Sequence, residues 1–142
     1  MTIKEVKEYL LQIKKIDKMI ENKIAEKDQW RLIATGVTAA PDNERVKSSG
    51  SQQKMESAIC RYMDIEKEID ASVDELIEKK KEVIGVIEQL PVAEYDILHK
   101  VYIQYMNFYE IAENYDKTYS WVTTVHGRAL NDLKRMLEGG AV

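Results

Sequence analysis

The stretch Phe108-Tyr-Glu-Ile-Ala-Glu-Asn-Tyr-Asp-Lys-Thr-Tyr-Ser-Trp-Val-Thr-Thr-Val-His-Gly-Arg-Ala-Leu130 predicts a short helix, a tight turn and a longer second helix. Ile111 and Ala112 supply the apolar side of the first helix. Asp116 lies in the turn, where its tolerance of left-handed backbone conformations is useful. Thr118 can act as the N-cap of the second helix, because its hydroxyl can accept the free N–H two or three residues later.

The second helix has one apolar face. Val122, Val125, Ala129 and Leu133 recur at three- and four-residue spacing, which is the spacing of a half-buried helix. Ala129, together with Ala112 of the first helix, is small enough to let two helices cross closely at a steep angle. This combination is typical of a DNA-binding helix-turn-helix.

The segment from Leu90 to about Leu133 resembles region four of bacterial sigma factors. The resemblance implies an all-helical domain whose second motif helix binds promoter DNA. It rests on Leu90-Pro91, Ile97-Leu98, Tyr102, Glu110-Ile111-Ala112-Glu113 and Val122-Thr-Thr-Val-His-Gly-Arg-Ala-Leu130.

This chain departs from the sigma pattern in two places. Asp116 replaces the turn glycine of the family, and the usual basic residues early in the second helix are replaced by Tyr119, Trp121, Thr123 and Thr124. The whole chain also resembles an uncharacterised family of small phage and prophage proteins that end in this domain.

The composition favours helix nearly throughout. The chain of 142 residues has only two prolines and six glycines, 44% hydrophobic residues and 32% charged residues. Its formal net charge of −4 does not suit a non-specific nucleic-acid binder. Within the second motif helix and its turn, Lys117, Arg128, Lys134 and Arg135 against Asp132 give +3, the sign that DNA requires.

The chain lacks the residue patterns of several functional classes. Cys60 is the single cysteine, which excludes an internal disulfide and fits a reducing cytoplasm. We expect no membrane span, because no apolar run approaches the length of a transmembrane helix. We expect no metal site, since His99 and His126 have no ligand spacing around them, and we expect no cofactor. His126 borders the buried face, so we expect a packed neutral ring. There is no nucleophile with a placed base and no phosphate-binding loop, so we do not expect an enzyme.

The N-terminal two thirds predict two long helices. Thr2-Ile-Lys-Glu5 has the spacing of a capping box, and the first helix should extend to about Asp28 or Ile33. A loop is expected over residues 35–50. A second helix over 52–90 has coiled-coil spacing, interrupted only by Lys80. Its apolar stripe is Met55, Ile59, Tyr62, Ile65, Ile69, Val73, Leu76, Val83, Ile87 and Leu90, and the first helix carries Ile3, Val6, Leu10, Ile13, Ile16, Ile20 and Ile24.

These two helices should form a long antiparallel hairpin over residues 1–90. Two helices bury little surface, so we expect a homodimer in which two hairpins make a four-helix bundle. The alternative is a monomer whose spare apolar face packs on its own C-terminal domain.

The helix-turn-helix domain is expected over 91–137, with a disordered tail over 138–142. A third helix should run from Pro91 to about Tyr105, with its inward side formed by Tyr95, Leu98, Val101 and Tyr102.

The residues expected to contact DNA lie opposite the buried face of the second motif helix or at its ends. Arg128 is the strongest candidate for a phosphate contact. Gly127 either lets a phosphate approach closely or is simply tolerated. Trp121 either packs against the DNA backbone or fills the gap between this domain and the hairpin. The candidates are Lys117, Thr118, Tyr119, Ser120, Trp121, Thr123, Thr124, Gly127, Arg128, Lys134 and Arg135.

The dense tyrosines of the C-terminal third are interpreted as the amphipathic core of a small domain. They are Tyr95, Tyr102, Tyr105, Tyr109, Tyr115 and Tyr119.

The sequence therefore predicts a cytoplasmic, sequence-specific regulator of transcription, of phage or prophage origin. It would act on double-stranded DNA at a promoter or through RNA polymerase. The alternative is a helical protein-interaction adaptor, or the DNA-recognition subunit of a phage packaging machine.

Overall fold

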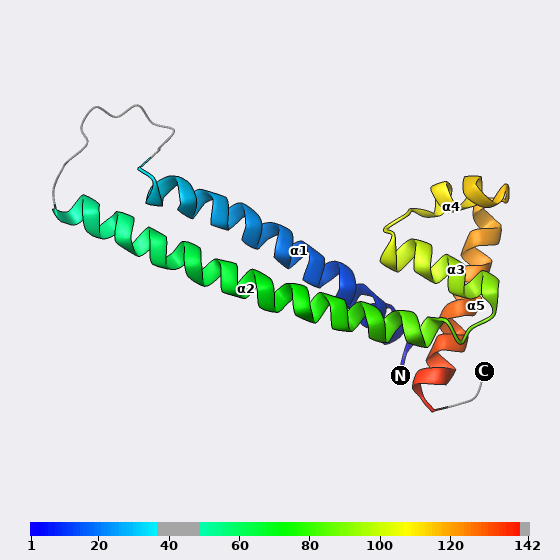
Figure 1. Cartoon of the computed structure of the whole chain (residues 1–142). Helices are drawn as coiled ribbons and strands as arrows, with labels where there is room; N and C mark the ends of the chain where they lie inside the picture. The colour runs from blue at the N-terminus through cyan, green and yellow to red at the C-terminus, as the bar shows by residue number, and fades with distance from the viewer. Residues whose placement is uncertain (37–48, 140–142) are drawn as a thin grey trace. The chain divides into compact units, whose positions relative to one another are not determined.

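The computed structural model describes residues 1–36 and 49–139, and every regular element in these ranges is helical. Figure 1 shows these helices in chain order. They are α1 (Ile3–Ala34), α2 (Ser49–Ile87), α3 (Val92–Leu98), a π-helical turn η1 (His99–Ile103), α4 (Phe108–Tyr115) and α5 (Tyr119–Leu137). The predicted all-helical class is confirmed.

The chain divides into two compact units. Unit 1 contains Met1–Ile16 and Leu76–Val142, and unit 2 contains Asp17–Glu75. The units do not coincide with the predicted division at residue 90. The start of α1 and the end of α2 group with the C-terminal helices, because their apolar side chains belong to the same core.

Unit 1 contains two apolar clusters. The first cluster joins α1, α2, α3, η1 and α5 through Val6, Leu10, Ile13, Val83, Ile87, Leu90, Leu98, Tyr102, Ala129, Leu130 and Leu133. The second cluster joins α3, α4 and α5 through Ile97, Ile111, Ala112, Val122 and Val125. Together these clusters hold α5 on one side while its other side stays exposed.

Unit 2 consists of antiparallel stretches of α1 and α2 with a thin apolar seam. Ile20, Ala58 and Ile65 are its buried hydrophobic side chains among the described residues. Charged residues at the edges of the seam connect the helices. Arg61 binds Glu26 at 3.1 Å and Glu68 at 3.0 Å, and Lys23 binds Glu68 at 3.2 Å. Such exposed pairs contribute little stability each, but they fix the pairing of the two helices.

The apolar stripe predicted for the long helices is wrong at Ile24 and Ile59. Both side chains are exposed, and Ala58 is buried in place of Ile59. A straight α-helix drifts by about 20° per heptad, so a stripe read at fixed heptad spacing leaves the seam after several turns. Beyond Ile20, the half-buried positions of α1 are instead Lys23, Glu26, Lys27, Trp30 and Ala34.

The predicted helix ends are close to the observed ones. The first helix extends to Ala34, and Gly36 follows with a φ of 73°. α2 begins at Ser49, so residues 49 and 50 are helical and the predicted loop is wrong at these two positions. The remainder of the predicted loop, residues 37–48, lies outside the described residues, as do residues 140–142 of the predicted tail.

The third helix differs more from its prediction. α3 ends at Leu98 and continues as the π-helical turn η1, after which Tyr105 takes a left-handed φ of 60°. Leu98 and Tyr102 are buried as predicted, whereas Tyr95 and Val101 are half-buried and Ile97 is fully buried. The amide of Gln104 donates to the carbonyl of His99 at 3.0 Å, which closes the widened turn.

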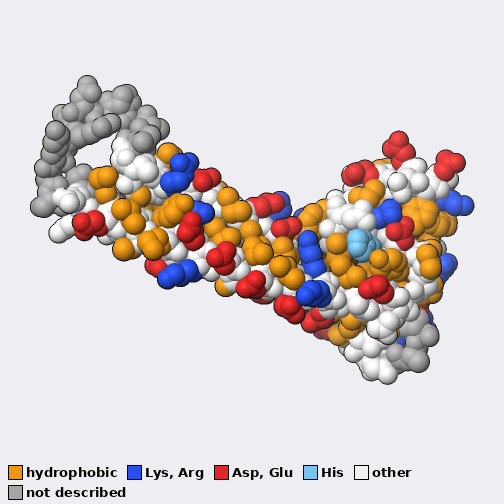
Figure 2. Space-filling view, in the orientation of Figure 1, with side chains coloured by type: hydrophobic (Ala, Val, Ile, Leu, Met, Phe, Trp, Pro, Cys, Tyr) orange, Lys and Arg blue, Asp and Glu red, His pale blue; other side chains and the backbone are white. Residues whose placement is uncertain are grey.

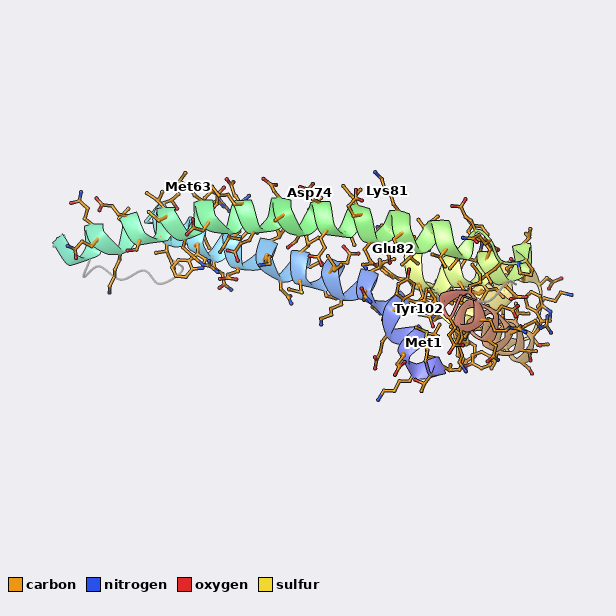
Figure 3. All side chains as sticks on the ribbon, turned by 90° about the horizontal axis from the view of Figure 1, so that it is seen from below. Met1, Met63, Asp74, Lys81, Glu82 and Tyr102 are labelled. Atoms are coloured by element: carbon orange, nitrogen blue, oxygen red, sulfur yellow. The ribbon has the colours of Figure 1, made fainter. Side chains whose placement is uncertain are left out.

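Hydrophobic side chains reach the surface along α1 and α2, as Figure 2 shows. Met19, Ile24, Leu32 and Ile33 of α1 and Ile59 and Met63 of α2 are exposed within unit 2. Met63 projects from the side of α2 that faces away from α1 (Figure 3). Within the described ranges, no helix combines the length and the apolar character that a bilayer crossing needs.

We expect alanine at Ile65 to destabilise the helical hairpin and alanine at Lys67 to have little effect. Ile65 is fully buried, so truncating its side chain should cost roughly 2–3 kcal/mol. Lys67 on the same helix is exposed and polar, and it provides the control. Urea unfolding followed by circular dichroism measures both. Equal losses for the two variants would contradict this assignment of the seam.

Candidate nucleic-acid interface

α4 begins with a capping box that is not among the features predicted from the sequence. The Asn107 side chain accepts a hydrogen bond from the Glu110 amide at 2.9 Å, and the Asn107 amide donates to Glu110 Oε1 at 3.2 Å. The spacing of Asn107 and Glu110, with Ile111 and Ala112 following, is the signal that could have revealed it. The box fixes the start of α4 and therefore the direction of its apolar side.

The turn between α4 and α5 has the predicted geometry. Asp116 adopts a left-handed conformation with a φ of 54°, and the Lys117 amide donates to the Ala112 carbonyl at 2.9 Å. Thr118 is the N-cap of α5, since its hydroxyl accepts a hydrogen bond from the Trp121 amide at 3.1 Å. The two helices and the turn are present as predicted, and their use in binding DNA remains a prediction.

The buried face of α5 agrees with the predicted face. Val122, Val125, Ala129 and Leu133 are all buried. Val122 and Val125 pack in the second apolar cluster with Ile111 and Ala112 of α4, whereas Ala129 and Leu133 pack in the first. The predicted close contact at Ala112 and Ala129 is therefore divided between two clusters.

Most candidate DNA contacts lie on the open side of α5 and its turn. Arg128 lies about two and a half turns from the N-terminus of α5 and is exposed. Gly127 and Lys134 are half-exposed, and an added Cβ at Gly127 would meet no atom within 4 Å. The exposed candidates are Lys117, Thr118, Tyr119, Ser120, Thr123, Thr124, Arg128 and Arg135.

Trp121 and Thr123 have contacts that restrict how they can meet DNA. Trp121 is half-buried and packs against the second apolar cluster, with its ring centroid 5.1 Å from that of Tyr115. Lys117 Nζ lies 5.8 Å from the centroid of the Trp121 ring. The expectation that Trp121 fills a gap beside the hairpin is replaced by packing against α4. Thr123 donates its hydroxyl to the Tyr119 carbonyl at 3.1 Å, so the hydroxyl offers an acceptor rather than a free donor.

His126 is a packed neutral ring, as expected. It is 7% exposed, its Nε2 lies 2.9 Å from the Tyr102 hydroxyl, and the Phe108 ring lies 4.9 Å away. Burial, and then the charge of Lys7, lower the pKa of His126 to about 4. The ring therefore carries no charge at neutral pH and serves the core.

A buried carboxyl group lies against the charged side of α5. Glu94 of α3 is 5% exposed, and Asp132 of α5 is also buried. Burial, and then the hydrogen bond and charge of Asp132, raise the pKa of Glu94 to about 7, while Arg128 and Arg135 oppose this shift. Arg135 binds the Asp132 carboxylate. The net charge around α5 therefore also depends on Glu94, which belongs to α3 and approaches α5 only in the folded protein.

The tyrosine interpretation is wrong for three of six residues. Tyr102 is buried, and Tyr95 and Tyr115 are half-buried, but Tyr105, Tyr109 and Tyr119 are exposed. Tyr109 is 72% exposed and its ring lies 4.6 Å from the ring of Tyr119. A position two residues before Ile111 lies about 200° around the helix from it, which is the signal that could have placed Tyr109 outside.

No family model, no curated protein and no solved structure matches this chain. Within residues 1–36 and 49–139, no group of three or more His, Cys, Asp or Glu side chains is arranged to hold a metal ion. Cys60 is a free, exposed thiol on α2.

We expect Gly127→Ala to stabilise the protein and to separate two uses of this glycine. The added methyl group meets open space, and glycine inside a helix costs about 1 kcal/mol relative to alanine. Thermal unfolding should therefore show a gain of about that size. If the glycine also admits a phosphate, the same variant should bind DNA more weakly; a loss of stability would contradict the open environment.

Proposed function

We propose that the protein is a DNA-binding regulator of transcription, of phage or prophage origin, which reads a promoter through α5 or acts there with RNA polymerase. The observation that carries the proposal is the division of α5 into two sides. One side is buried in two apolar clusters, and the other presents Tyr119, Ser120, Thr123 and Thr124 from the first two turns. Hydroxyl groups and threonine methyl groups are suited to base edges in the major groove.

The charges near this surface support phosphate contacts. Lys117 and Arg128 are exposed at the turn and in the middle of α5, so they could hold the backbone on either side of the base-reading residues. The chain as a whole carries a net charge of −4. Acidic residues elsewhere would weaken non-specific binding and leave recognition to this one surface.

We expect the full chain to retain a promoter-like fragment from its parent genome, with affinity that falls steeply as salt rises. Replacing Thr124 and Arg128 together with alanine should weaken binding at least tenfold, because it removes a base contact and a phosphate contact. Fluorescence anisotropy on the retained DNA fragment, called the enriched fragment below, measures the loss of affinity.

Lys81→Ala is the matched control, because Lys81 is an exposed cation on α2, outside the α4–α5 surface (Figure 3). It should change affinity less than twofold. Equal losses of affinity for the control and the double variant would indicate that binding depends on overall charge and not on this surface. Absence of any salt-sensitive DNA binding and of any polymerase contact would refute the proposal.

We also propose that unit 2 pairs with unit 2 of a second copy. Its described part buries three hydrophobic side chains and exposes six large ones, which is too little core for two isolated helices. Pairing two such hairpins would cover these side chains in a four-helix bundle. A dimer would also present two copies of α5 to two half-sites on DNA.

We expect light scattering to give twice the chain mass of 16.5 kDa, and Met63→Glu to shift the protein toward the monomer. Met63 is 52% exposed, and a glutamate there would be buried without a partner in the paired state. Ser57→Glu adds the same charge at an exposed position of α2 without removing a hydrophobic side chain and should leave the mass unchanged. A monomeric wild-type chain at micromolar concentration would refute the pairing.

The second candidate function is a protein-interaction adaptor, in which the exposed side chains of unit 2 bind another protein and α5 is not used on DNA. The same six exposed hydrophobic residues favour it. The two functions differ in their response to alanine at Thr124 and Arg128. The double variant would bind DNA more weakly, whereas binding to a protein partner would persist.

A further inference from the structure

The carboxyl group of Glu94 occupies an unusual environment. Glu94 is the third residue of α3, it is 5% exposed, and its Oε1 receives no hydrogen bond from any donor in the described part of the chain. A buried carboxylate without a donor is costly, whereas a protonated carboxyl can donate a hydrogen bond of its own. The geometry therefore favours a proton on Glu94.

Asp132 is the neighbouring carboxylate toward which a protonated Glu94 can donate. It is buried on α5, which packs against α3, and its carboxylate is bound by Arg135. The neighbouring Glu94 carboxyl, and then Arg135, hold the pKa of Asp132 below its usual range. Two adjacent carboxyl groups in one buried site ionise in separate steps, so the pair retains one proton after Asp132 has ionised.

The charged groups that act on Glu94 from α5 are Asp132, Arg128 and Arg135. His126, the histidine of the same helix, stays neutral above about pH 5 because its pKa is lowered to about 4. Arg128 and Arg135 are the groups that favour the ionised form of Glu94. They are also candidate phosphate contacts, so one pair of guanidinium groups faces both the acidic pair and the proposed ligand.

We propose that the Glu94–Asp132 pair makes DNA binding proton-linked, so that the protein takes up a proton at Glu94 when phosphates occupy Arg128 and Arg135. This inference rests on the proposed DNA-binding function. A phosphate beside the arginines offsets their positive charge and adds a negative one, which disfavours the second carboxylate. Proton binding and phosphate binding therefore strengthen each other, and the coupling is reciprocal.

The test compares the wild-type chain with Glu94→Gln by fluorescence anisotropy on the enriched fragment, from pH 6 to pH 8 at constant salt. Glutamine retains a donor toward Asp132 at every pH and mimics the protonated carboxyl. Wild-type affinity should be at least about fivefold higher at pH 6 than at pH 8, the lower end of typical coupling. Glu94→Gln should bind with the wild-type pH 6 affinity throughout.

A second measurement requires no DNA. Because the folded state holds the proton more tightly than the unfolded state, the stability contributed by protonated Glu94 is present at low pH and is lost as the pH rises from about 4.5 to about 7. The thermal midpoint of the wild type should therefore fall relative to that of Glu94→Gln between pH 5.5 and pH 8. His126 is common to both proteins, so its own titration cancels in the difference.

The outcomes separate this inference from the proposed function. Failure to bind DNA at any pH removes both, whatever the stability difference shows. DNA binding with the same pH dependence in the two proteins overturns the inference alone, and so does a constant difference in midpoint. Should Glu94→Gln fail to fold, carbon NMR of the wild-type glutamate carboxyl groups with and without DNA decides the same question, because proton uptake must appear as a raised Glu94 pKa in the complex.

Discussion

The burial of one face of α5 is the constraint on which unit 1 depends. Val122 and Val125 of this face close the cluster with α3 and α4, and Ala129, Leu130 and Leu133 close the cluster with the paired ends of α1 and α2. α5 therefore belongs to both clusters, as does the short helix α3 through Ile97 and Leu98. Any rotation of α5 would expose apolar side chains in both clusters at once, so its outward side is held in a fixed direction.

The ends of α4 and α5 serve the same constraint by backbone hydrogen bonding. The capping box of Asn107 and Glu110, the left-handed Asp116 and the N-cap Thr118 satisfy backbone groups that would otherwise be exposed or unpaired. They set where each helix begins. Because the first turn of α5 carries Tyr119 and Ser120, the caps also determine which polar groups a ligand would meet.

Unit 2 depends on a small apolar seam with ion pairs at its edges. Its described seam buries Ile20, Ala58 and Ile65, and the positions beside the seam carry charged residues such as Arg61 and Glu68. Exposed ion pairs specify how two helices align but add little free energy. The hydrophobic side chains left at the surface of this unit are the physical reason to propose a second copy, and the α5 surface does not depend on them.

Sequence alone determined the two motif helices, the turn between them and the buried face of α5, because these follow from local spacing. Val122, Val125, Ala129 and Leu133 share a face whatever packs on it, and Thr118 caps the N-terminus of α5. Fixed spacing failed at Ile24 and Ile59, where drift along a long helix carries a residue off the seam. Only the tertiary structure decided that Tyr109 is exposed beside Tyr119 and that Glu94 of α3 is buried against Asp132 of α5. Those contacts join residues on different helices, and no periodicity within one helix encodes the approach of another.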